Sequence, residues 1–348
     1  MPAHESAEHD TPVRAFVITG PRASEVAVVA EPVPRDGEAV VDVHRVGVCG
    51  TDAELFTGEM AYVRSGIARY PLRVGHEWCG TVAAVGGAED APWIGRRVTA
   101  DTMVGCGSCR RCQSGRHHLC PRLSEIGIQG PYPGALAERI LVPVRSLHAL
   151  PDRVDDAGGA MVEPGGNAWR SLDAAALVAG ERLLVLGPGT IGLLVALLAR
   201  ARGIEVHLLA RPGRSFEFAR SLGFAVWHAE RPPDLPFDAI VDASNSPSFP
   251  ARALELVEPG RRVVCIGLSG DPSLIDSRMI VLREVTVVGI LGASAGLAPA
   301  IEAYASGRVD PRPLVAATVG LDEVGPVLEG WRPSTAGPGP KIHVDPRR

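Results

Sequence analysis

The sequence predicts an α/β protein in two parts, a mostly β first part and a doubly wound parallel sheet. Three observations predict this fold class. The chain has 348 residues, which exceeds the size at which one hydrophobic core stops growing, so we expect two domains. Before about residue 155, short strand-like runs alternate with glycine and proline turns. Beyond that point, apolar strands alternate with helical stretches, as in a parallel sheet.

In the first part, no long amphipathic helix is expected before about residue 155. Strand composition is found at residues 14–19, 25–29, 39–44, 80–86, 95–99 and 137–142. These runs are short and closely spaced, so they indicate an antiparallel or barrel-like region.

The second part opens with residues 182–186, an apolar run typical of a strand buried on both faces of a parallel sheet. A glycine turn, a helix at 193–202 and a strand at 205–209 complete one right-handed unit. Further strands are expected at 225–227, 239–242, 262–266 and 285–288, with helices at 215–222, 251–257 and 298–306. A last strand at 341–344 suggests that the C-terminus returns to the first domain.

Composition argues against several classes of function and location. The net charge of −5 and the aromatic content of 5% disfavour a nucleic-acid surface, and no apolar run is long enough to span a membrane. Residues 1–12, expected to form a loose tail, lack the basic start and apolar core of a secretory signal. The chain has seven cysteines, an odd number, and four of them lie within fifteen residues. This arrangement favours metal ligands in a reducing compartment over a set of disulfides. We therefore expect a cytoplasmic protein with no nucleic-acid or membrane partner.

A cysteine-rich lobe, residues 105–121, predicts a structural zinc site. Its expected ligands are Cys106, Cys109, Cys112 and Cys120, spaced Cys-x2-Cys-x2-Cys-x7-Cys. The glycines between them let the backbone turn tightly enough for the four thiolates to converge. An iron–sulfur cluster requires a different last spacing, and two disulfides do not suit a reducing compartment. A site closed by four cysteines leaves no position for substrate.

An open metal site is predicted around Gly75-His76-Glu77, with Cys49 further upstream. A thiolate, an imidazole and a carboxylate are ligands that a catalytic Zn²⁺ takes, and they leave a fourth position for water or substrate. The competing interpretation is an ordinary surface turn.

A dinucleotide site is predicted at Gly187-x-Gly189-x-x-Gly192, where Thr190 and Ile191 open a helix directly after the buried strand. Backbone N–H groups at such a helix start can hold a pyrophosphate; a glycine-rich connector without a ligand is the alternative.

The next strand ends at Ala210-Arg211, where NAD-binding proteins carry a carboxylate for the ribose. Arg211 and Arg214 favour NADP over NAD by charge, unless both arginines lie on a solvated loop. Gly267 and Ile290 complete the expected cofactor-binding set.

These motifs resemble zinc-dependent medium-chain alcohol dehydrogenases over nearly the whole chain after residue 13. The motifs that carry the resemblance are Cys49-Gly50-Thr51-Asp52, Gly75-His76-Glu77, the four-cysteine lobe, Gly134-x-x-Ala137-Glu138 and the nucleotide turn. The Glu163-Pro164 pair is similar to the branch that holds sorbitol, threonine and sugar dehydrogenases.

The resemblance implies that Cys49, His76 and Glu77 ligate the catalytic zinc, with Glu163 as an occasional or fourth ligand. Thr51 would pass the alcohol proton onward, and Glu54 stands where many relatives have the next relay group, a histidine. It also implies a GroES-like catalytic domain (13–160), a Rossmann domain (161–297), a C-terminal return (298–348), and a homodimer or homotetramer.

The function expected is hydride transfer between NAD(P) and a secondary alcohol of a polyol, sugar, cyclitol or amino-alcohol, with two zinc ions per chain. A different-class alternative is a non-catalytic zinc- and nucleotide-binding protein with a structural or sensory role. A zinc-free quinone reductase would lack the cysteine lobe and the open ligand set. An aminocyclitol dehydrogenase of antibiotic biosynthesis is a narrower possibility within the enzyme class.

Overall fold

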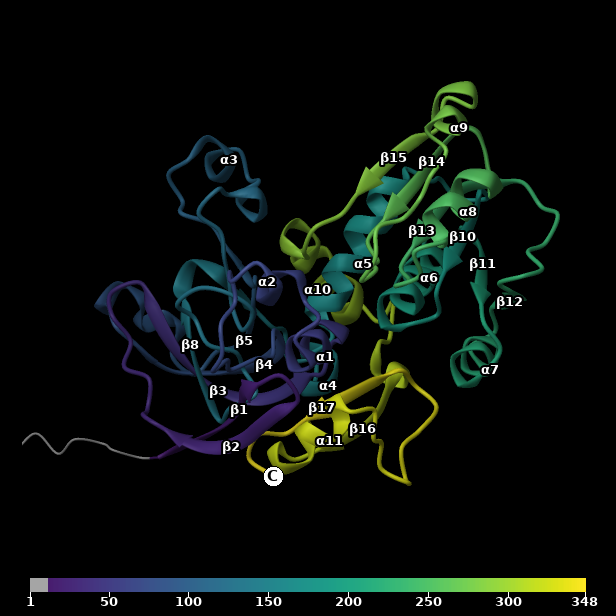
Figure 1. Ribbon diagram of the computed structural model, residues 1–348. Coiled ribbons are helices and arrows are strands. Elements are labelled where there is room, and N and C mark those ends of the chain that lie inside the picture. Colours follow the sequence, from purple (N-terminus) through teal and green to yellow (C-terminus); the bar gives the residue numbers. More distant parts are fainter. Residues whose placement is uncertain (1–11) are drawn as a thin grey trace, which may run out of the picture.

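The computed structural model describes residues 12–348 and contains two sheet-based parts joined by a central helix (Figure 1). The predicted tail, residues 1–12, lies outside the described residues except for Pro12. Among residues 12–348, no helix is both long and apolar enough to cross a membrane.

A seven-stranded sheet forms the first part, with the strand order β16-β17-β3-β4-β5-β9 and with β8 paired to β3. Its strands from the N-terminal region are β3 (Glu38–Gly47), β4 (Glu77–Val85), β5 (Arg97–Ala100), β8 (Arg139–Pro143) and β9 (Leu147–Ala149). Beside it lies an antiparallel ribbon of β1 (Val13–Gly20) and β2 (Ala23–Val29), and a small hairpin pairs β6 (Met103–Val104) with β7 (Ser124–Glu125). The strands predicted at 14–19, 25–29, 39–44, 80–86 and 137–142 are confirmed by these elements, and the run at 95–99 corresponds to β5.

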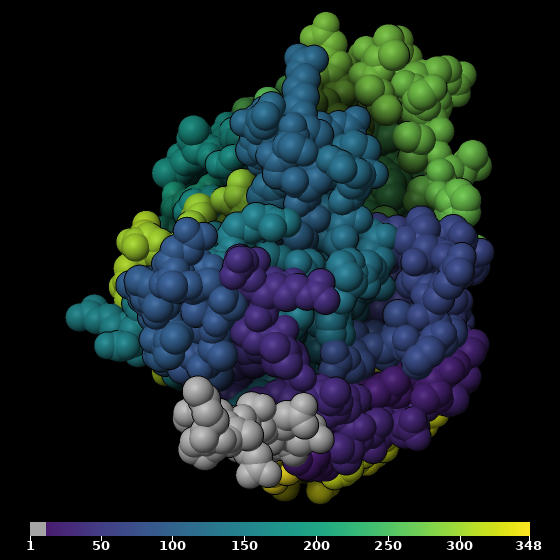
Figure 2. All heavy atoms as spheres, turned by 90° about the vertical axis from the view of Figure 1, so that its left-hand side faces the viewer, coloured from purple at the N-terminus to yellow at the C-terminus, as the bar shows by residue number. Residues whose placement is uncertain are grey.

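Short helices connect these strands, and the sequence pattern did not predict them. They are α1 (Gly50–Thr57), α2 (Ala61–Arg64), η1 (Ala88–Trp93), α3 (Arg110–Gln113), η2 (His117–Leu119), η3 (Val144–Ser146) and α4 (Asp156–Gly159). The lobe around α3 and η2 projects from the surface, where Figure 2 shows it in blue.

The second part is a six-stranded parallel sheet with the order β12-β11-β10-β13-β14-β15. Its elements are β10 (Arg182–Leu186), α6 (Thr190–Ala201), β11 (Glu205–Ala210), α7 (Arg214–Ser221), β12 (Ala225–His228), β13 (Phe237–Asp242), α8 (Phe249–Leu256), β14 (Val257–Cys265), α9 (Ser277–Leu282) and β15 (Thr286–Gly289). Leu183 and Val185 of β10 face one core, and Leu184 and Leu186 face another on the opposite side. Burial on both faces explains why this strand is apolar at successive positions.

Helix α5 (Val162–Ala175) was not predicted, although it is the longest helix of the described residues. Its first turns contain Pro164, Gly165 and Gly166, which are poor helix formers and hide the helix from a reading of composition. The small residues have a packing role, because a Cβ on Gly165 would lie 2.1 Å from the Tyr304 hydroxyl of α10.

The C-terminal segment places its last strand in the first sheet (Figure 1, yellow). Strand β17 (Lys341–Val344) pairs in parallel with β16 (Val315–Val319) and antiparallel with β3. The other elements of this segment are η4 (Ser294–Gly296), α10 (Leu297–Ala305), η5 (Arg312–Leu314), η6 (Leu321–Glu323) and α11 (Val324–Leu328).

Candidate active site

His76 is placed by a glycine that no other residue could replace without strain. Gly75 has φ +100°, and a Cβ there would lie 2.8 Å from the backbone nitrogen of Leu136. The Gly75 N–H donates to Oδ1 of Asp52 at 3.2 Å, and the same oxygen lies 3.5 Å from Nδ1 of His76. The turn therefore orients the imidazole toward a fully buried carboxylate.

Asp52 also fixes Cys49, because the Cys49 N–H donates to Oδ2 of Asp52 at 2.9 Å. Cys49 is the N-cap of α1, so its thiol is held at the start of that helix. The carboxylate of Asp52 thus positions both Cys49 and His76. In the sequence, Asp52 was noted only as part of the Cys49-Gly50-Thr51-Asp52 motif.

The structure brings Cys49, His76 and Glu77 together, with one ligand atom from each within 4.8 Å of the others. This donor set of sulfur, nitrogen and oxygen fits Zn²⁺ with a position left open. Thr51 lies in the first turn of α1, and Glu54 lies further along the same helix. Burial, and secondarily the negative charge of Glu59, raises the pKa of Glu54 above its usual range.

Lys341 of β17 pairs with Glu77 and was missed by sequence reasoning. Its Nζ lies 2.5 Å from Oε2 of Glu77 and donates to the Val48 carbonyl at 2.9 Å. Gly47 makes room for this pair, since a Cβ there would lie 2.3 Å from the same oxygen. The signal in the sequence was that Lys341 is the only lysine of the chain and that it opens a strand-like run.

Glu163 lies outside the three-residue cluster but faces it from the start of α5. Its Oε1 accepts a hydrogen bond of 2.8 Å from Asn167, one helical turn later, so Asn167 is inside the helix and is not its cap. Burial raises the pKa of Glu163 to about 7, and the charges of His76 and Lys341 oppose this shift.

The four cysteines of the lobe converge, with all four sulfurs within 4.8 Å of one another. The distances from Sγ of Cys109 to those of Cys112 and Cys120 are 3.5 and 3.8 Å. A tetrahedron with Zn–S bonds of about 2.3 Å has edges of about 3.8 Å. All four thiols are free, so these residues fit a closed zinc site and form no disulfide.

The glycine turn after β10 has the geometry of a phosphate-binding loop. Gly187 has φ +94°, and a Cβ on Gly192 would lie 2.0 Å from the Gly187 carbonyl, so strand and helix approach closely. Gly189 faces open space and caps α6, whose first residues are Thr190 and Ile191. Free N–H groups at this helix start can hold a phosphate.

A cavity of 540 Å³ opens at the carboxyl ends of β10, β11 and β13, and Gly187, Arg211 and Arg214 line it. The strand order reverses here, which is where dinucleotides bind in doubly wound sheets. Burial, together with the charge of Arg214, lowers the pKa of Arg332, a C-terminal arginine that does not itself line this cavity. Nothing in the local sequence indicated Arg332.

The other two predicted cofactor residues follow the carboxyl ends of neighbouring strands. Gly267 comes after β14, and a Cβ there would lie 1.7 Å from the Ser244 carbonyl. Ile290 comes after β15, and its N–H donates to the Cys265 carbonyl at 3.0 Å.

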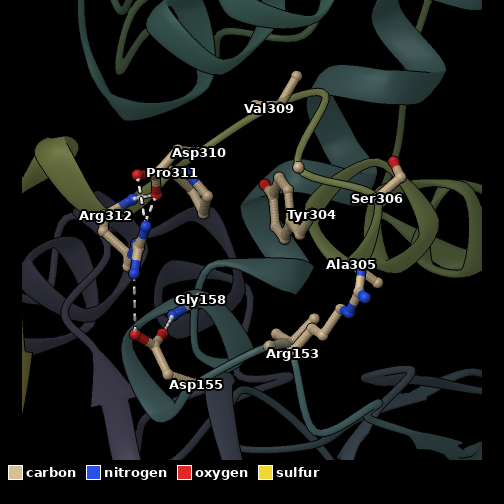
Figure 3. A pocket seen from close by; sticks show the side chains of 12 residues that line it. Arg153, Asp155, Gly158, Tyr304, Ala305, Ser306, Val309, Asp310, Pro311 and Arg312 are labelled. Atoms are coloured by element: carbon tan, nitrogen blue, oxygen red, sulfur yellow. Dashed lines mark hydrogen bonds and ion pairs between the residues drawn. The ribbon is translucent and has the colours of Figure 1, made fainter.

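A further cavity, of 270 Å³, lies beside α10 and is drawn in Figure 3. Arg312 at its rim is paired with Asp310 and lies 3.7 Å from Asp155. No predicted site residue lines this cavity, and the charge of Arg312 is compensated.

Comparison with known proteins decides the family. Residues 35–152 match the alcohol dehydrogenase GroES-like domain, and residues 190–306 match the zinc-binding dehydrogenase family. L-threonine 3-dehydrogenase of Saccharopolyspora erythraea is 32% identical over 293 residues, which cover 80% of this chain and 84% of the relative. The chain belongs to the zinc-dependent medium-chain dehydrogenase family.

Two other family members extend the comparison. The 2-dehydro-3-deoxy-L-galactonate 5-dehydrogenase of Pseudoalteromonas atlantica is 33% identical over 307 residues, covering 84% of this chain and 87% of the relative. The crystal structure of a zinc-binding dehydrogenase from Sinorhizobium meliloti bound to NADP has a TM-score of 0.86 at 28% identity and covers 97% of this chain and 100% of that one. The predicted family, the α/β fold with its GroES-like and nucleotide-binding parts, and the class of NAD(P)-dependent alcohol dehydrogenase are confirmed.

Proposed function

We propose that this medium-chain dehydrogenase oxidises a secondary alcohol of a polyol, sugar, cyclitol or amino-alcohol, with NADP preferred over NAD. The observation that carries the proposal is the open cluster of Cys49, His76 and Glu77 in the same chain as the dinucleotide cavity. We assign residues 13–160 to the catalytic domain, 161–297 to the nucleotide domain and 298–348 to the C-terminal return.

In the mechanism, Cys49, His76 and Glu77 would hold the catalytic zinc, and Glu163 could join them. A zinc ion held by these residues would lower the pKa of a substrate hydroxyl and so favour loss of its proton near neutral pH. Asp52 orients His76, and Lys341 neutralises Glu77 and holds one of its oxygens. Thr51 would take the substrate proton and pass it toward Glu54, a carboxylate that can also act as a proton relay. The four cysteines of the lobe would hold the second zinc.

The cofactor preference is supported by charge at the cavity. Arg211, Arg214 and Arg332 make no ion pair within residues 12–348, and no carboxylate follows β11 where NAD-specific proteins place one. A 2′-phosphate would supply the missing negative charge. The Sinorhizobium meliloti relative was crystallised with NADP.

The substrate proposal is supported by the relatives, which are named for threonine and for a deoxy-galactonate. Both names describe small hydroxylated acids, so a small polar alcohol suits the family. The family match favours an enzyme over the structural or sensory alternative, and an aminocyclitol dehydrogenase stays a narrower candidate within it.

A homodimer or homotetramer in the cytoplasm is the assembly and location that we propose. Edge strand β15 and helix α9 expose large apolar side chains, namely Val281, Leu282 and Val287, and the nearby loop exposes Leu274. An uncovered apolar patch beside a sheet edge is typical of a protein interface. No nucleic-acid or membrane partner is proposed.

The test is Cys49→Ala. This variant should lose alcohol oxidation by at least about 100-fold, because a catalytic ligand is absent, yet should bind NADPH with unchanged affinity in a fluorescence titration. Unchanged turnover would contradict the proposed function.

A further inference from the structure

Glu125 on β7 is a buried carboxylate that the mechanism above does not use. Only 3% of its surface is exposed. The Tyr62 hydroxyl at 3.3 Å and the Gln129 amide at 3.2 Å both donate to the same oxygen, Oε1. Within residues 12–348, no hydrogen bond reaches Oε2, and no lysine, arginine or histidine forms an ion pair with Glu125.

The segment that carries Glu125 contacts both the chain after β15 and the turn that precedes His76. It pairs with Met103 across the β6–β7 hairpin, so the two side chains share a face. A Cβ on Gly292 would lie 2.5 Å from Cε of Met103, which places this hairpin against the segment after β15. On the other side, a Cβ on Gly127 would lie 2.7 Å from the Gly75 carbonyl, next to His76.

The charge of Glu125 is poorly compensated where it lies. Burial raises its pKa, and the hydrogen bonds from Gln129 and Tyr62, together with the more distant charge of His76, oppose that rise only in part. A buried carboxylate without a cation is costly, and neutral donors on one oxygen leave the charge itself unpaired. Such groups are enriched where a ligand supplies the missing partner.

We propose that Glu125 binds the ammonium group of an amino-alcohol substrate, while Tyr62 and Gln129 orient its carboxylate. This inference rests on the proposed function, since it selects one substrate class for the same site. A second hydroxyl on the substrate would satisfy Oε2 as a hydrogen-bond acceptor but would leave its charge uncompensated. An ammonium group donates a hydrogen bond to Oε2 and also compensates the negative charge of Glu125. Such charge-assisted hydrogen bonds are about twice as strong as neutral ones.

Three secondary alcohols that differ in a single group test the inference: 1-amino-2-propanol, 1,2-propanediol and 2-butanol. We expect the wild-type enzyme to show the highest kcat/KM for the ammonium compound. Glu125→Gln should lower kcat/KM for that compound by about 30-fold or more, mainly through KM, and should change the value for 2-butanol by less than about 3-fold. Glu125→Asp, which keeps the charge, should retain part of the preference.

Glu38→Gln is the matched control, because Glu38 also accepts a tyrosine hydroxyl bond of 3.3 Å, from Tyr132, in the same domain. It should leave the order of the three substrates unchanged. An equal loss for all three alcohols in Glu125→Gln would show a merely structural role, and a wild-type preference for the diol would overturn the ammonium assignment.

A binding measurement distinguishes failure of this inference from failure of the proposed function. The NADPH complex should bind 1-amino-2-propanol, measured by calorimetry, and Glu125→Gln should weaken that binding by a similar factor. Absence of turnover with all three alcohols would count against the proposed function, whereas loss of binding in Glu125→Gln would still support the role of Glu125. Equal binding to both proteins would overturn it.

Discussion

Lys341 and Glu77 form an ion pair with side chains that are almost fully buried, at 4% and 3% exposed, and the two residues lie on strands from opposite ends of the chain. Removing one partner of such a pair leaves the other charge buried alone, which typically costs more than the pair gains.

In the metal-free protein, Lys341→Met should therefore lower the free energy of unfolding by about 3 kcal/mol. Urea denaturation followed by circular dichroism measures it. Lys341→Arg, which keeps a cation at the position, serves as the control. A loss below about 1 kcal/mol in Lys341→Met would mean that Glu77 is compensated by another group.

At this scale, the sequence predicted the residues that are close together in the chain. The cysteine spacing and the His76-Glu77 pair required only local geometry. Asn167 was noted from the sequence as a residue that lines the cleft or caps a helix; its hydrogen bond to Glu163 required helix α5, in which residues four apart lie on one face. Lys341 could not be paired with Glu77, because the register of β17 against β3 depends on the packing of the whole sheet.

Among the elements, the strand–turn–helix from β10 to α6 depends on two glycines for different physical reasons. Gly192 permits the close approach of helix and strand, whereas Gly189 faces the space in which a pyrophosphate would lie.

Gly192→Ala should lower the melting temperature, because its Cβ would overlap the Gly187 carbonyl. Gly189→Ala should keep the melting temperature within about 2 °C but weaken NADPH binding, because the new methyl group occupies the ligand space. Thermal unfolding and fluorescence titration of both variants measure the two effects. The same behaviour in both would contradict the separation of roles.

Asp156 joins α4 to the first sheet through hydrogen bonds with His44 and Arg97, and these hold the pKa of its carboxyl below the usual range. A lowered folded-state pKa gives stability that is fully present above the ordinary aspartate value, about 3.9, and is lost progressively as the pH falls from that value through the lower folded-state pKa.

Asp156→Asn should cost about 1 kcal/mol at pH 7, since the side chain is about one-third exposed, and should cost less at pH 2.5, which lies between the ordinary aspartate value and the lowered folded-state pKa. Urea unfolding of both proteins at the two pH values measures this. A difference that persists unchanged at pH 2.5 would contradict the assigned cause.

The elements that the sequence predicted were those with a clear period. The strands of the parallel sheet and helices α6, α7, α8 and α10 lie within a few residues of their predicted positions. Helix α5 was not predicted because its first turns contain Pro164, Gly165 and Gly166, which are typical of turns rather than of a helix.

In the whole molecule, the C-terminal return brings a distant arginine within reach of the charge of the nucleotide domain. Arg332 comes from the segment before β17, and burial, together with the charge of Arg214, which lines the dinucleotide cavity, lowers its pKa. Arg332 itself does not line that cavity.

Arg214→Ser and Arg332→Ser should each weaken NADPH binding by about 10-fold and change NADH binding by less than about 2-fold, because only NADPH carries the 2′-phosphate. Fluorescence titration with both cofactors measures the ratio. Equal losses for both cofactors would show that these arginines do not contact the 2′-phosphate.

The central claim is that one chain holds two zinc sites of different character, one closed and one open. Elemental analysis of the purified wild-type protein and of Cys49→Ala, together with their turnover, tests it most directly. The account predicts two zinc ions per wild-type chain, and one zinc with no turnover in Cys49→Ala, because the four-cysteine site is untouched. Two zinc ions with full turnover in Cys49→Ala would contradict it.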